Sequence, residues 1–253
     1  HVASKRFPRA IQENINRLYI RLFKIDMRRF EEGPFASLNA LFTRRLKEPP
    51  VIDSDPEAIV SPCDAKIVGV GKIEDGEVYQ IKLMTYSLRA LLLDLDVRPY
   101  EGGEFINLYL SPKDYHRYHA PLTMRIGEAY HIPGKLYPVH LKALKTIKNL
   151  YIENERVVLR CFDERGREFV MVFVGALNVG KMLFHFDERI TTNHHPSEPT
   201  HYTYENLWIN KGDELGMFMM GSTILLFFSE GMSQLVCSET RDVIVGQRLG
   251  TLT

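Results

Sequence analysis

The dipeptide Gly221-Ser222 is the part of this sequence whose residue types most clearly suggest chemistry. Gly221 has no Cβ, so its carbonyl is open to close approach and its backbone tolerates a strained geometry. Ser222 places a hydroxyl beside that carbonyl, and attack by its Oγ would convert the amide into an ester. Loss of the Ser222 α-proton would then eliminate the ester, and hydrolysis would leave a pyruvoyl group and ammonia. The pair is therefore a candidate cleavage site, although Gly-Ser before a strand is also typical of a plain turn.

Such a cleavage needs a base, and two further segments carry suitable side chains at the edges of predicted strands. Residues 111–114 (SPKD) have the pattern of a helix start, with a Ser cap and Pro at the first helical position. That helix would place His116 and His119 on one face. Asp64 directly precedes another predicted strand, and a carboxylate bonded to one imidazole nitrogen lets the other act as a base. The spacing alone does not show that Asp64, His119 and Ser222 meet.

Several segments of the chain resemble the phosphatidylserine decarboxylases, pyruvoyl-dependent membrane enzymes of phospholipid synthesis. They occur in the family's order: SLNALFTRRLK (37–47), SPCDAKI (61–67), YLSPKDYHRYHAP (109–121), IPGKLYPVH (132–140), NERVVL (154–159), VGALNVGKM (174–182) and KGDELGMFMMGSTILLFF (211–228). The resemblance implies that Asp64, His119 and Ser222 are the family's charge relay. It also implies self-cleavage between Gly221 and Ser222. The products would be a β chain, residues 1–221, and an α chain, residues 222–253, that begins with a pyruvoyl group made from Ser222.

The same resemblance implies the reaction and its setting. Phosphatidylserine would become phosphatidylethanolamine and CO₂ through a Schiff base on the pyruvoyl ketone. We expect His119 to reprotonate the product, with His116 as the alternative. His116, Lys82 and Tyr137 are the candidate contacts for the substrate's headgroup. The family's enzymes imply a peripheral protein on the cytoplasmic face of the cell membrane, and a homodimer stays open.

Bulk composition excludes several other classes. No apolar run is long enough to cross a membrane as a helix. The three cysteines are far apart and fit neither a disulfide framework nor a zinc site. His194 and His195 fall in a predicted exposed loop, so we expect no metal site with His116 and His119. The basic residues lack the motifs of a nucleic-acid-binding protein.

The chain divides into a basic N-terminal segment and a strand-rich remainder. Residues 1–47 hold eleven Lys or Arg and four acids, although the whole chain has no net charge. Residues 8–30 have the period of one amphipathic helix, and residues 38–46 of a second, capped by Ser37. The helical stripe of the first consists of Ile11, Ile15, Leu18, Leu22 and Ile25. This stripe either packs on the body or lies on an anionic membrane surface.

Residues 48–253 would form the catalytic domain, beginning with a linker over 48–58. Short strands are predicted at 66–70, 77–82, 105–110, 124–131, 156–162, 168–175, 224–228 and 243–245, with a helix over 86–95. The resulting fold class is α+β: N-terminal amphipathic helices followed by a strand-rich antiparallel or mixed β core.

Two other functions stay open at this point. A self-processing hydrolase would keep Ser222 as an N-terminal nucleophile with a free amine. A non-catalytic lipid-binding membrane protein would never be cleaved.

Overall fold

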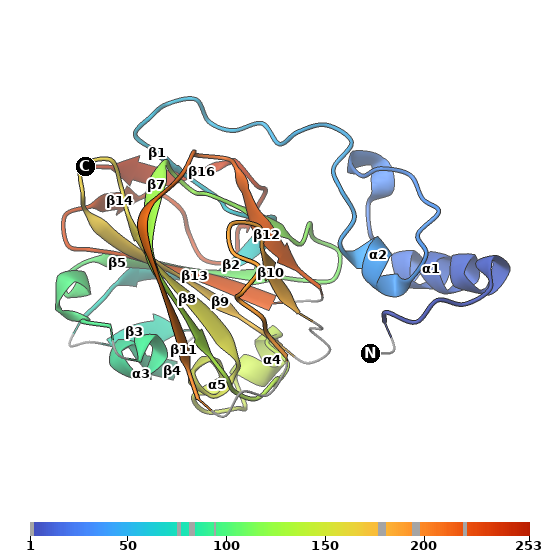
Figure 1. Cartoon of the computed structure of the whole chain (residues 1–253), viewed down its shortest axis with the longest axis horizontal. Helices are drawn as coiled ribbons and strands as arrows, with labels where there is room; N and C mark the ends of the chain where they lie inside the picture. The colour runs from blue at the N-terminus through green and yellow to red at the C-terminus, as the bar shows by residue number, and fades with distance from the viewer. Residues whose placement is uncertain are drawn as a thin grey trace.

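The computed structural model describes residues 3–74, 77–80, 84–93, 95–176, 181–193, 198–219 and 222–253. Figure 1 shows a body built mainly of strands, with helices α1 and α2 together on one side of it. A long connection leads from α2 over the body to its first strand, β1.

The central element of the body is an eight-stranded antiparallel sheet in the order β11-β7-β8-β9-β13-β5-β2-β15. Its strands are β2 (Ala65–Lys72), β5 (Glu104–Leu110), β7 (Met124–Ile132), β8 (Arg156–Phe162), β9 (Glu168–Val174), β11 (Thr200–Ile209), β13 (Ser222–Phe228) and β15 (Asp242–Val243). Every residue of β13 is buried. Residues 224, 226 and 228 face one hydrophobic cluster, and residues 225 and 227 face the other. Burial on both faces explains why the sequence of this strand is a continuous apolar run.

Different elements cover the two faces of this sheet. Two three-stranded sheets contribute to the first cluster: β10 (Met182–Phe184), β12 (Glu214–Phe218) and β6 (Arg117–His119), then β1 (Ala58–Val60), β16 (Arg248–Leu252) and β14 (Ser233–Leu235). Short helices contribute to the second: α3 (Leu88–Leu92), α4 (Leu141–Leu144) and α5 (Leu150–Glu153). The hairpin of β3 (Glu77–Gln80) and β4 (Met84–Ser87) and the 3₁₀ turn η3 (Arg98–Tyr100) complete the body. The predicted α+β fold with a strand-rich core is confirmed.

Four predicted helices differ from the structure, two of them in the body. Residues 111–114 form a turn, in which the Asp114 carboxylate accepts bonds from the Ser111 N–H and hydroxyl at 2.7 Å each. Residues 117–119 then form strand β6, because pairing with β12 outweighs the local helix signal. The predicted helix 86–95 is only α3, since Tyr86 belongs to β4 and the hydroxyl of Ser87 caps the helix at Ala90.

The other two lie in the N-terminal segment, by which we mean residues 3–47. Its first helix, α1 (Arg9–Phe23), ends well before residue 30, because Lys24 adopts a left-handed conformation. A 3₁₀ turn, η1 (Met27–Arg29), follows it. The second helix, α2 (Leu38–Phe42), is shorter than predicted, but Ser37 caps it by accepting a bond from the Ala40 N–H. These breaks let residues 25–44 fold back against the body.

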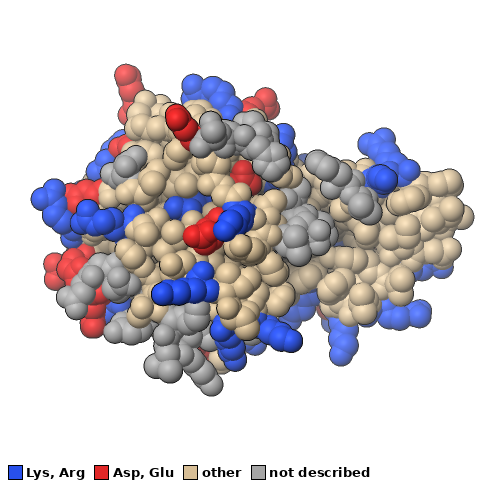
Figure 2. All heavy atoms as spheres, turned by 90° about the horizontal axis from the view of Figure 1, so that it is seen from below, with Lys and Arg blue, Asp and Glu red and all other residues tan. Residues whose placement is uncertain are grey.

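Helix α1 turns two of its polar side chains inward and most of its apolar stripe outward. Gln12 and Asn16 are buried and bonded to each other, and Asn16 also donates to the Phe35 carbonyl. Along the stripe, Ile11 is 51%, Leu18 66% and Leu22 69% exposed. The stripe therefore does not pack on the body, apart from Ile25 beyond the helix end. Figure 2 shows the N-terminal segment on the right, with a largely uncharged surface and Lys and Arg side chains along its rim.

Candidate active site

Ser222 is the first residue of β13 and lies opposite Leu110, the last residue of β5. Its side chain is fully buried, and its Oγ has no hydrogen-bond partner among the described residues. An unpaired buried hydroxyl costs about 1–3 kcal/mol. Thr223 Oγ1, the next hydroxyl along β13, is also buried and without a partner among the described residues. What marks Ser222 as a candidate nucleophile is therefore the unpaired hydroxyl together with its place directly after Gly221. Its neighbour in the predicted cleavage site, Gly221, lies outside the described residues.

His119 ends strand β6, and both of its ring nitrogens are engaged. Nδ1 lies 2.8 Å from the Gly212 carbonyl, to which it donates, and Nε2 lies 3.3 Å from the Tyr115 hydroxyl. The carbonyl therefore fixes the proton on Nδ1, and Nε2 keeps its lone pair toward Tyr115. Burial lowers the pKa of His119, so the ring is neutral at pH 7. Burial also raises the pKa of Tyr115, so the tyrosine stays a donor.

Asp64 is buried beside β2 and is held by other partners than His119. Its Oδ2 accepts from Arg29 Nη1 at 2.7 Å, and its Oδ1 accepts from the Val245 N–H at 2.9 Å. In the parts of the chain that the structure describes, no hydrogen bond joins Asp64 to His119. Their backbones are still close in the fold, because the His119 N–H donates to the carbonyl of Pro62 at 2.8 Å. The charge of Asp64 also favours the protonated ring of His119.

His116 is the second histidine of this region and is fully buried. Its Nδ1 lies 2.8 Å from the Asp114 carbonyl, and its ring packs on Phe42 with centroids 3.8 Å apart. Burial, followed by the charge of Arg44, holds its pKa well below the ordinary value. Its Nε2 has no partner among the described residues, so the neutral ring presents a free acceptor.

The sheet register brings Ser222 and Asp64 to one end of the sheet, which we call the catalytic corner, and the bond from the His119 N–H to the Pro62 carbonyl ties His119 to it. It contains the start of β13, the end of β5 and the start of β2. Ser222 lies opposite Leu110, and Val243 of β15 lies opposite Ala65 on the far side of β5. With about 4.8 Å between strands, Ser222 and Ala65 are roughly 10 Å apart. Asp64 precedes Ala65, and the loop carrying His116 leaves β5 directly after Leu110.

A cavity of about 320 Å³ opens at this corner, between the N-terminal segment and the body. The segment contributes Lys24, Asp26, Arg29 and Phe30 to its wall. The body contributes Asp64, Ala65, Lys113, Asp114, Asp242, Val243 and Ile244. Charges of both signs thus line a space that Asp64 borders directly.

The other predicted headgroup contacts are less informative. Lys82 lies outside the described residues. Tyr137 is held through its backbone by Asn154, whose amide also donates to the Gly175 carbonyl at 2.8 Å. Gly175 follows Val174, the partner of Thr223, so this tyrosine approaches β13 from the side opposite to β5. Within the described parts of the chain, no hydrogen bond or ion pair joins Tyr137 to a relay candidate, and its role stays a prediction.

Three residues that the sequence did not reveal take part in the corner. Arg29 binds Asp64, and Tyr115 and Gly212 bind the two nitrogens of His119. Tyr115 lies within the conspicuous DYHRYH stretch, but nothing in the spacing singled it out. The described residues include no group of three or more His, Cys, Asp or Glu side chains that could hold a metal ion. His194 and His195 lie outside them.

Comparison with known proteins places the chain in one family. The family model of phosphatidylserine decarboxylases matches residues 38–251. The phosphatidylserine decarboxylase proenzyme of Helicobacter pylori (strain Shi470) is 46% identical, with 89% of this chain and 85% of that protein covered. The Campylobacter jejuni proenzyme is 45% identical over 91% and 88%. The Halorhodospira halophila proenzyme is 35% identical over 100% and 87%. The chain belongs to the phosphatidylserine decarboxylases, a family of enzymes made as proenzymes.

Proposed function

We propose that this chain cleaves itself before Ser222, forms a pyruvoyl group there, and then converts phosphatidylserine to phosphatidylethanolamine and CO₂. The buried, unpartnered Oγ of Ser222 is the observation that carries the proposal. It belongs to the first residue of a fully buried strand, where the substrate's carboxylate would meet little water. Family membership supports the decarboxylation, and the hydroxyl supports Ser222 as the source of the pyruvoyl group.

In the precursor, His119 is the general base. Once the long bond from the Tyr115 hydroxyl gives way, its Nε2 would take the Ser222 hydroxyl proton while Oγ attacks the carbonyl of residue 221, and the C–O bond forms as the C–N bond breaks. The proton passes to the released amine. Loss of the Ser222 α-proton then expels the carboxylate of residue 221, and water displaces ammonia. The Gly212 carbonyl assists by keeping the other proton of His119 on Nδ1.

In the mature enzyme, the pyruvoyl group would supply an electron-withdrawing ketone for loss of CO₂ from the serine headgroup. This chain's own residues must bind the headgroup and return a proton to its carbon. His119 is our first candidate for that proton transfer. His116, with its free Nε2, is the second.

Membrane contact would come from the exposed stripe of α1. Ile11, Leu18 and Leu22 present apolar surface. Four exposed basic residues accompany it: Arg17 and Arg21 on α1, Lys24 at its end and Arg28 in the 3₁₀ turn that follows. A helix of this kind lies in the plane of an anionic bilayer. None of the described helices is long and apolar enough to cross a membrane. We infer that the enzyme works on the cytoplasmic membrane face, with phosphatidylserine as both substrate and anionic surface.

Intact mass spectrometry of the purified protein tests this proposal. The expected result is two chains, with residues 222–253 lighter by ammonia than a chain beginning with serine. Ser222→Ala should remain one chain. A serine amine on the smaller chain would favour the N-terminal-nucleophile hydrolase. An uncut wild type that binds vesicles without decarboxylating them would favour the lipid-binding protein.

A further inference from the structure

The N-terminal segment touches the catalytic corner at several of its key residues. Arg29 pairs with Asp64 at 2.7 Å, and the Phe30 ring lies 6.3 Å from that of Tyr115, the partner of His119. Farther along, Phe42 covers His116. Arg44 donates to the carbonyls of residues 113 and 114 at 2.6 and 3.0 Å. A segment whose first helix exposes its apolar stripe is thus built into the wall of the site.

We propose that Arg29 and His119 compete for the carboxylate of Asp64, which makes Arg29 a positioning residue that weakens His119 as a base in the precursor. The inference deepens the proposed function, because it depends on His119 being the base for cleavage. The match to the family model begins at residue 38, so Arg29 lies outside the matched residues.

The oxygens of Asp64 show why the two partners exclude each other. Arg29 approaches both oxygens, at 2.7 Å through Nη1 and 3.4 Å through Nη2, and the Val245 N–H takes a further position on Oδ1. Only 6% of the Asp64 side chain is exposed, so the carboxylate needs a charged or N–H partner. With Arg29 in place, Nδ1 of His119 donates to a neutral carbonyl, that of Gly212, and not to a carboxylate.

The exposure of Arg29 indicates that its pair with Asp64 can open. The Arg29 side chain is 41% exposed at the edge of the corner cavity, so its charge regains water when it leaves. Asp64 then keeps its charge with fewer donors. His119 is anchored to the same turn, because its backbone N–H donates to the carbonyl of Pro62, and in this proposal its ring N–H is the donor that replaces Arg29. A carboxylate partner strengthens an imidazole base more than a peptide carbonyl does.

The charges that face His119 define what the test must separate. Glu214 and Asp64 favour its protonated form, Arg117 disfavours it, and Tyr115 donates to it. Removing Arg29 also removes a positive charge from this neighbourhood. The experiment therefore needs a background in which Asp64 carries no charge, so that the direct and the Asp64-mediated effects of Arg29 can be compared.

The first measurement uses the full-length Ser222→Ala precursor, in which the His119 ring is titrated by NMR and assigned with a His119→Gln variant. Arg29→Gln should raise the His119 titration midpoint, and Arg29→Lys should stay close to the parent. In an Asp64→Asn background, Arg29→Gln should move the midpoint by less than half as much. Arg167→Gln is the matched control, because Arg167 forms a comparable pair with the buried Asp163 far along the chain, at 2.7 Å. It should leave His119 unchanged.

The second measurement restores Ser222 and follows self-cleavage on a gel. Arg29→Gln should cleave several-fold faster than the parent, and Arg167→Gln at the parent rate. An unchanged His119 midpoint, an equal shift in the Asp64→Asn background, or slower cleavage of Arg29→Gln would overturn the competition. If the Ser222 protein never cleaves, the proposed function fails, while the titration still decides whether Arg29 and His119 share Asp64.

Discussion

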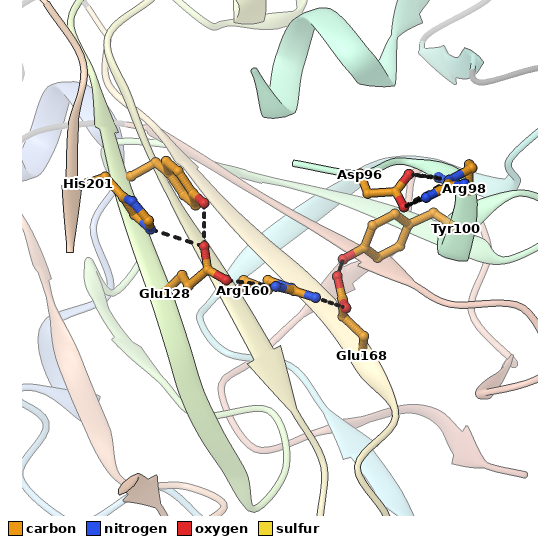
Figure 3. Close-up of polar contacts among 8 residues, drawn as sticks. Asp96, Arg98, Tyr100, Glu128, Arg160, Glu168 and His201 are labelled. Carbon is orange, nitrogen blue, oxygen red and sulfur yellow. Dashed lines mark hydrogen bonds and ion pairs between the residues drawn. The ribbon is translucent and has the colours of Figure 1, made fainter. Parts of the chain in front are cut away.

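Two polar regions of the same sheet are built on opposite principles. At one end, Arg160 bridges Glu128 and Glu168 across β7, β8 and β9 at 2.7 Å each (Figure 3). His201 forms a further bond with Glu128, and Tyr100 donates one to Glu168. Burial works against the charge of Glu128, but bonds from Tyr130 and Arg160 outweigh it and lower its pKa. Apart from Nε of Arg160, each charged group there has a partner.

The catalytic corner, at the other end of the sheet, leaves polar atoms unpaired. Ser222 Oγ and His116 Nε2 have no partner among the described residues. Both His116 and His119 are held neutral by burial. The network around Arg160 stabilises the packing of three strands, whereas the corner gives up stability and keeps reactive groups available. The comparison predicts that changes in the two regions separate activity from stability.

The largest effect is expected at Ser222. Ser222→Ala removes the nucleophile and should abolish self-cleavage. It should not destabilise the fold, because the deleted hydroxyl has no partner among the described residues and its burial costs about 1–3 kcal/mol. A denaturing gel checks the first statement and thermal unfolding the second. A marked loss of stability would show that Ser222 is a structural serine.

His119 should follow, and Asp64 should matter less. His119→Ala removes the general base and should slow cleavage by on the order of 10²–10⁴-fold. Asp64→Asn should slow it less, because the Gly212 carbonyl already fixes the tautomer of His119. Time courses on gels measure both rates. Normal processing in His119→Ala would exclude this histidine as the base, and equal losses in both variants would mean that Asp64 reaches His119 during the reaction.

The buried histidines of the catalytic corner should make both the cleavage rate and the stability depend on pH. His119 acts as a base only when unprotonated, and burial lowers its pKa from 6.5. Cleavage should therefore be constant near neutral pH and fall only below that lowered pKa. Stability should fall as the pH drops below about 6.5, because the unfolded histidines take up protons that the buried rings refuse. Rate and denaturation series from pH 8 to pH 5 test both; a cleavage midpoint above 6.5 would contradict the first.

The network around Arg160 should give the reverse of Ser222. Arg160→Met leaves Glu128 and Glu168 without their shared cation, which should cost about 2 kcal/mol, between the values for surface and buried ion pairs. Cleavage should keep its rate as long as the variant is folded. Urea denaturation measures the loss, and the time course of processing at low temperature serves as its control. Slower cleavage in folded Arg160→Met would mean that the two ends are coupled.

The sequence predicted the elements whose pattern is local and failed where tertiary pairing decides. The apolar run of β13 and the cap at Ser37 were visible because burial and capping depend on neighbouring residues. Strand β6 was mistaken for a helix, since three residues carry no period and only pairing with β12 makes them a strand. The partnership of Arg29 with Asp64 joins positions 35 residues apart, and no local pattern reports it.

The smallest effect on the fold is expected on α1, where a hydrophobic stripe lies outside the core. Leu18 and Leu22 are 66% and 69% exposed, so Leu18→Ser with Leu22→Ser should change stability by no more than about 0.5 kcal/mol per site. The same change removes apolar area that we expect to enter the bilayer, and sedimentation with phosphatidylserine vesicles should show weaker binding. Gln substitutions at Arg17, Arg21, Lys24 and Arg28 should instead make the remaining binding less sensitive to salt.

Leu41→Ser is the matched control for the stripe variant, because Leu41 is buried. It should destabilise and unfold the N-terminal segment while the charges of that segment stay the same. If Leu18→Ser with Leu22→Ser lost stability and still bound vesicles like the wild type, the stripe would be part of a protein interface and α1 would not be the membrane anchor.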